Sequence, residues 1–133
     1  MRRLIESLSC RPPATDEAVA VFEKVSGMQL PDDYRHFLQI ANGGEGFIGK
    51  NAYVILWGVE ELASLNEAYE VEDYAPGLLI IGSDGGGEAY GFDTRNPQWT
   101  TVEVPFVGMA WSLARPIAGS FTGFLEHLYS STV

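Results

Sequence analysis

The sequence has 133 residues, of which 46% are hydrophobic and 20% charged, as expected for one folded domain of ordinary size. Eighteen acidic residues against eight basic ones give a net charge of −10, which argues against direct binding to nucleic-acid phosphates or anionic membranes. No apolar run approaches the roughly 20 residues of a membrane span. The single cysteine, Cys10, excludes an intrachain disulfide and a thiolate metal cluster.

These totals predict a cytoplasmic protein, since the basic start of the chain is not followed by a long apolar segment for export. The acidity suits a basic protein partner, because opposite charge speeds the encounter, or it serves solubility alone. We expect residues 1–14 to form an N-terminal segment and residues 15–133 to form one domain.

Two helices are expected after the Pro12–Pro13 break. Thr15 has the side chain of a helix cap, Gly27 ends that first helix, and its predicted buried stripe comprises Ala18, Val21, Phe22 and Val25. The second helix begins near Pro31 and ends at Asn42–Gly43. Its predicted buried stripe comprises Tyr34, Phe37, Leu38 and Ala41.

The next segments predict a strand and an acidic helix. Residues 52–57 are rich in β-branched and aromatic side chains, which favours a strand, and they extend a hairpin that begins near Gly44. Helical spacing follows from Val59 to Tyr69, with Leu62, Leu65 and Tyr69 expected to point inward. No Lys or Arg occurs from Glu60 to Asp73. This stretch is either a solvated helix face or a docking surface.

The stretch from Leu78 to Asp93 predicts the centre of the fold. Residues 78–81 are apolar at every position, as in a strand covered on both faces. Asp84-Gly85-Gly86-Gly87 then precedes a segment of period two, which favours an antiparallel hairpin. A phosphate-binding loop is disfavoured because no Lys follows and the next element resembles a strand, not a helix.

The C-terminal third adds one strand and one helix. Residues 100–107 alternate as in a half-buried strand near a sheet edge, since Pro105 cannot donate a hydrogen bond. Ser120 is a suitable cap for a last helix, whose predicted buried residues are Phe121, Phe124, Leu125 and Leu128. The element order predicts an α+β fold, with a mainly antiparallel central sheet packed against helices on one side.

Catalytic chemistry finds little support in the sequence. Asp84, Glu88 and Asp93 bracket a turn and match no metal-loop spacing, while His36 and His127 lie off the apolar stripes. We expect no catalytic residue, metal or other cofactor; a cleft joining Glu88, Asp93 and a histidine would favour an enzyme instead. A second alternative is a small-molecule pocket, formed by Trp57, Tyr90, Phe92 and Trp111.

Three stretches in this order resemble the SUKH superfamily of bacterial toxin-immunity proteins and fungal regulators of cell-wall synthesis. They are Leu30–Gly44, Ile80–Asp93 and Ser120–Leu125. The resemblance implies an α+β fold without catalytic residues and a role in protein binding. It most often implies neutralisation of a co-encoded toxin, frequently a nuclease. The alternative that it leaves open is an intracellular adaptor or regulator.

On the immunity hypothesis, an acidic surface would cover the basic groove of a toxin domain. The acidic side chains predicted to bind the partner are Glu60, Glu61, Glu67, Glu70, Glu72 and Asp73, followed by Asp84 and Glu88.

Overall fold

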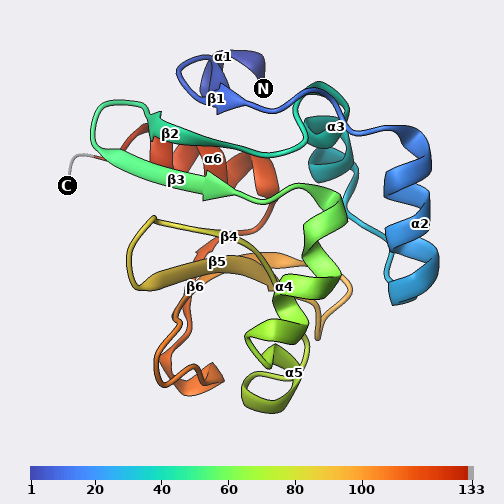
Figure 1. The fold of residues 1–133 in the computed structure, drawn as a ribbon. Coiled ribbons are helices and arrows are strands. Elements are labelled where there is room, and N and C mark those ends of the chain that lie inside the picture. The colour runs from blue at the N-terminus through green and yellow to red at the C-terminus, as the bar shows by residue number, and fades with distance from the viewer. Residues whose placement is uncertain (132–133) are drawn as a thin grey trace.

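The computed structural model describes residues 1–131, in which one seven-stranded sheet follows the order of the chain (Figure 1). Every neighbouring pair of strands is antiparallel. The strands are β1 (Ser9–Cys10), β2 (Gly44–Ile48), β3 (Ala52–Leu56), β4 (Leu78–Ser83), β5 (Glu88–Asp93), β6 (Thr100–Pro105) and β7 (Arg115–Ala118). This topology confirms the α+β class and the antiparallel sheet.

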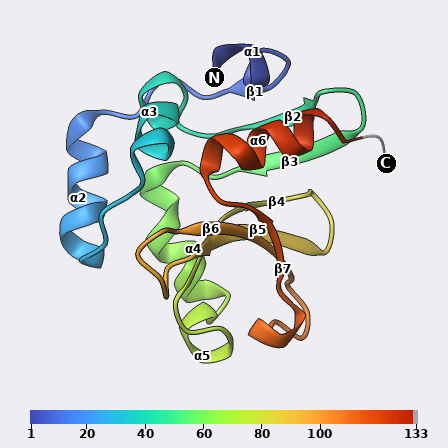
Figure 2. The same cartoon turned by 180° about the vertical axis from the view of Figure 1, so that it is seen from behind.

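Helices cover both faces of the sheet. They are α1 (Arg2–Ile5), α2 (Asp16–Ser26), α3 (Asp32–Ile40), α4 (Leu62–Ala68), α5 (Val71–Tyr74) and α6 (Phe121–Tyr129), with 3-10 turns η1 (Val59–Glu61) and η2 (Trp111–Leu113). Helix α6 lies behind the sheet in Figure 1 and in front of it in Figure 2, whereas α4 and α5 lie on the opposite side. The expectation of helices on one side is therefore wrong. Strand β4 is apolar on both faces, so both faces need a cover.

The β4–β5 hairpin at the centre of the sheet is confirmed. Strand β4 is the fourth of the seven, and all its residues are buried. In the turn, Gly85 adopts φ 83°, a conformation that favours glycine. The Asp84 carboxylate accepts the backbone N–H groups of Gly86 at 2.7 Å and Glu88 at 3.2 Å. Asp84 therefore closes the turn through its own side chain.

An aromatic cluster joins α3, α6 and β5. The Tyr34 ring lies 4.9 Å from Phe121 and 5.3 Å from Phe92, measured between ring centroids. The predicted stripes of α3 and α6 are buried, and Ser120 caps α6 by accepting the Gly123 N–H at 3.0 Å. These contacts fix α3 and α6 on one face of the sheet.

The predicted stripe of α2 is only partly confirmed, whereas both ends of the helix are confirmed. Thr15 accepts the Ala18 N–H at 3.0 Å, and Gly27 ends the helix in the left-handed conformation. Phe22 is buried as predicted, but Val21 is 53% exposed and Val25 77% exposed, and Val19 is buried instead. Helix α2 packs against η1 at the side of the molecule and not against the sheet (Figure 1), so only a narrow strip of its surface is covered.

Several elements depart from the expectations or were missed. Helix α3 ends at Ile40, and Gly43 takes φ 85° three residues later. Strand β7 pairs with β6, which places β6 next to the edge strand. The N-terminal segment forms α1 and β1, and its buried side chains Leu4, Ile5 and Leu8 belong to the same core.

Among the helices of residues 1–131, none has the length and apolar character that a bilayer crossing demands.

Candidate protein-binding surfaces

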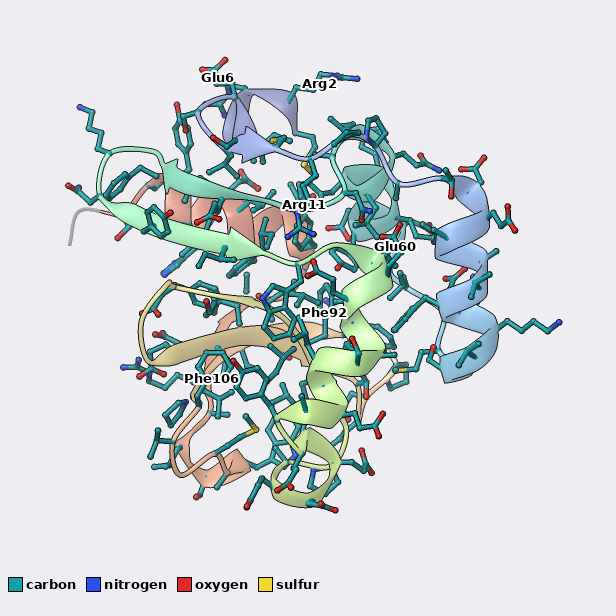
Figure 3. All side chains as sticks on the ribbon, viewed as in Figure 1. Arg2, Glu6, Arg11, Glu60, Phe92 and Phe106 are labelled. Carbon is teal, nitrogen blue, oxygen red and sulfur yellow. The ribbon has the colours of Figure 1, made fainter. Side chains whose placement is uncertain are left out.

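Glu60 and Glu61 bond to other parts of the fold. Glu60 accepts the Asn42 side-chain amide at 2.6 Å. Glu61 accepts the Gly58 N–H at 2.9 Å and pairs with Arg11; Figure 3 shows Arg11 and Glu60 close to the start of α4. Burial opposes ionisation of Glu61, but the Gly58 N–H and the Arg11 guanidinium outweigh it and lower the pKa. Both carboxylates thus link η1 to earlier segments of the chain.

The structure brings four other predicted acids together. We call them the α4–α5 acidic face: Glu67, Glu70, Glu72 and Asp73. Each is exposed, and together they line a hollow of about 530 Å³ whose apolar walls include Val71, Leu78 and Leu79. Their side chains form no ion pair with any residue in the range 1–131. Their charges are therefore not compensated within this part of the fold.

The acidic face curves because the predicted helix is broken. Helix α4 ends at Ala68, Glu70 adopts the left-handed conformation with φ 55°, and α5 begins at Val71. A left-handed residue reverses the helical path, so the carboxylates surround the hollow and do not lie along one straight helix face.

Tyr69, which was predicted to point inward, is 44% exposed. Its ring stacks on Trp57, with centroids 6.2 Å apart, and lies 4.7 Å from the Phe106 ring, labelled in Figure 3. Held between two aromatic neighbours, Tyr69 is a rigid aromatic group next to the acidic face. Side chains of this kind are common in the energetic centres of protein interfaces.

Asn66 attaches α4 to the sheet, and sequence reasoning missed this role. Strand β3 pairs with β4 only at Gly82 and Ser83, which leaves the first half of β4 without a strand neighbour on that side. The Asn66 amide donates to the Ile80 carbonyl at 2.9 Å and accepts the Ile80 N–H at 2.8 Å. Its side chain thus replaces a neighbouring strand and fixes the position of the acidic face.

Asp84 and Glu88 belong to a second acidic group at the other end of β4 and β5. A hollow of about 830 Å³ opens there between the sheet and the end of α6, and Asp84 and Glu103 contribute to its lining. Burial and the nearby charges of Glu103 and Asp84 raise the pKa of Glu88. The eight predicted residues therefore occupy three separate places.

The structure does not bring together the carboxylates that were considered as a catalytic group. Glu88 and Asp93 stand at opposite ends of β5, about 17 Å apart at the usual strand rise. Both Asp93 oxygens accept Arg95 N–H groups at 3.0 Å, and these bonds lower the pKa of Asp93. Within residues 1–131, no three His, Cys, Asp or Glu side chains are placed to hold a metal ion.

The four aromatic residues of the small-molecule hypothesis contact different neighbours. Trp57 stacks on Tyr69, and the other three pack against separate residues. Tyr90 packs on Phe124, Phe92 on Tyr34, and Trp111 under the Arg95 guanidinium. Within the described chain no ring contact joins any two of the four.

A comparison with curated proteins gave no match. A comparison with family models matched residues 13–127, which is most of the chain, to the SMI1 / KNR4 family (SUKH-1). That range contains both acidic groups and the hairpin between β4 and β5. The chain belongs to the SMI1 / KNR4 family (SUKH-1).

Proposed function

We propose that this chain is an immunity protein that neutralises a co-encoded toxin by covering a basic surface of the toxin, such as the phosphate-binding groove of a nuclease. SUKH proteins are generally non-enzymatic and bind protein partners. The observation that carries the proposal is the α4–α5 acidic face, in which four exposed carboxylates surround one hollow.

The physical basis is competition for a basic groove. A nuclease binds nucleic-acid phosphates with Lys and Arg side chains, and a rigid acidic surface can pair with the same side chains. Long-range attraction raises the association rate. Tyr69 and Phe106, next to the acidic face, supply aromatic contact area that slows dissociation once the proteins have met.

The test is a double charge reversal, Glu67→Lys with Glu70→Lys, measured against the toxin encoded by the neighbouring gene. We expect the association rate to fall about tenfold or more at low salt and its salt dependence to weaken. Thermal stability should change little, because neither side chain makes an ion pair among residues 1–131. Surface plasmon resonance at several salt concentrations measures both quantities.

A matched control changes the net charge equally on another face. Glu6 and Glu126 are exposed and lie on the α1–α6 side of the molecule. Glu6→Lys with Glu126→Lys should leave the association rate within about twofold of the native value, since steering depends on where the charges lie. Equal slowing by both double variants, or none by the first, would show that the α4–α5 acidic face is not the binding surface.

The family match also supports a second candidate, an adaptor or regulator of the SMI1 / KNR4 type that binds a protein of its own cell. Gene order and co-purification distinguish the two. A toxin gene directly upstream whose product co-purifies with this chain favours immunity. A stable complex with a cellular protein, in the absence of such a gene, favours the regulator.

A further inference from the structure

The hollow at the end of the sheet is built from segments far apart in the sequence. It lies between β3, the β4–β5 turn, β5 to β7 and the last turn of α6. We call it the sheet-end hollow. The lining side chains that bear on ligand binding are Asp84, Tyr90, Glu103, Arg115, Ile117 and Leu128.

The electrostatic field of the sheet-end hollow favours a cation. Asp84 and Glu103 line it, and Glu88 stands beside them on β5. Burial, followed by the charges of Glu103, Asp84 and Glu88, raises the pKa of the Tyr90 phenol to about 12. Burial disfavours any charged group, whereas the three nearby carboxylates attract a positive one.

Tyr90 also offers an unused hydrogen-bonding group. The residue is only 7% exposed, its ring packs against Phe124 with centroids 5.0 Å apart, and its side chain lines the hollow. Within residues 1–131 its hydroxyl has no hydrogen-bond partner. The hydroxyl oxygen is accessible from the hollow and not fully buried, so an N–H donor that enters the hollow can bond to it.

The ion pair of Arg115 indicates which kind of cation the sheet-end hollow can bind. The Arg115 Nη2 atom lies 3.1 Å from Glu103 Oε1, while the Arg115 side chain remains 67% exposed. A guanidinium group of this chain thus already bonds to one side of the hollow, without filling it. Since the acceptors come from a turn and two strands, they suit a planar group with several N–H donors better than a compact ammonium.

We propose that the sheet-end hollow binds an arginine side chain that projects from the basic protein partner. The guanidinium lies between Asp84, Glu103 and the Tyr90 hydroxyl, and its aliphatic stem contacts Ile117 and Leu128. This inference rests on the proposed function, because the basic protein partner would supply the arginine. It makes the hollow an anchoring point separate from the α4–α5 acidic face.

The experiment needs no partner. The folded chain, labelled with nitrogen-15, is titrated with Nα-acetyl-arginine amide and followed by NMR. We expect saturable shifts of the backbone amides of Tyr90, Glu103 and Arg115. The neutral isostere Nα-acetyl-citrulline amide should cause none, and Nα-acetyl-lysine amide should bind at least about threefold more weakly. Equal binding of the arginine and citrulline compounds, or tighter binding of lysine, overturns the proposal.

Four variants then locate the site. Glu103→Gln should weaken binding of the arginine compound about tenfold, and Tyr90→Phe, which keeps the packing on Phe124, about threefold. Arg115→Gln should strengthen it severalfold, since it removes the competing cation. Glu17→Gln changes the net charge as Glu103→Gln does, but lies on α2, and should leave binding unchanged. Equal weakening by Glu17→Gln, or no change with Glu103→Gln and Arg115→Gln, overturns the assignment.

A failure of the proposed arginine site can be distinguished from a failure of the proposed function. The titration measures the hollow alone, so its failure removes the arginine site and leaves the α4–α5 acidic face as the proposed surface. If the charge reversals on that face have no effect on the partner, the proposed binding surface fails, whatever the outcome of the titration.

Discussion

Loss of the Asn66 side chain should destabilise the fold, because this side chain bonds to the backbone of β4. Its amide satisfies both the N–H and the C=O of Ile80 in a half of β4 that lacks a strand neighbour on that side. Asn66→Ala leaves both groups without these partners, so we expect the free energy of unfolding to fall by about 2–3 kcal/mol. Urea denaturation followed by circular dichroism measures the change.

The control for Asn66 is Asn96→Ala in the exposed turn between β5 and β6. This substitution should change the free energy of unfolding by less than about 0.5 kcal/mol. Similar values for the two variants would contradict the role assigned to Asn66. Sequence reasoning could not predict this role, because a polar residue on a helix carries no mark of the strand edge that it meets.

At the scale of elements, the junction between α4 and α5 depends on Glu70. A non-glycine residue in the left-handed conformation costs roughly 1 kcal/mol, and Glu70 is the one described residue other than glycine with positive φ. Glu70→Gly should therefore raise the free energy of unfolding by up to about 1 kcal/mol. Glu72→Gly, within α5, should lower it by about 0.5–1 kcal/mol. Urea denaturation of the two variants tests the opposite signs, and destabilisation by Glu70→Gly would contradict the prediction.

Elements encoded by short stretches could be predicted from the sequence. The β4–β5 hairpin follows from an apolar run, a glycine turn and a returning strand, and α6 follows from its cap and its apolar spacing. The buried face of α2 could not be predicted, because it is set by η1, which begins more than 30 residues later. The short strands β1 and β7 were missed because their pairing, not their own residues, defines them.

At the scale of the molecule, the density of acidic residues in the sequence predicted the group from Glu67 to Asp73. It did not predict which acidic side chains bond to other parts of the fold. Glu61 bonds to Arg11, 50 residues away in the sequence, so its engagement depends on the completed fold. The sheet-end hollow joins Asp84 to Glu103, Arg115 and His127, which no local pattern connects. Whether either surface binds a partner stays a prediction.

The net charge of −10 makes the stability of the whole molecule depend on salt. Eighteen acidic residues repel one another at low ionic strength, and the screening length falls from about 30 Å at 10 mM salt to about 8 Å at 150 mM. We expect the melting temperature to rise by about 2–5 °C over this range of sodium chloride, which corresponds to roughly 0.5–1 kcal/mol. Scanning calorimetry measures the change. The Glu67→Lys, Glu70→Lys variant has two fewer negative and two more positive charges, so its net charge falls in magnitude from −10 to about −6 and its melting temperature should rise less with salt. A fall of the melting temperature with salt in the native chain would show that its ion pairs, such as Arg115–Glu103, outweigh the repulsion.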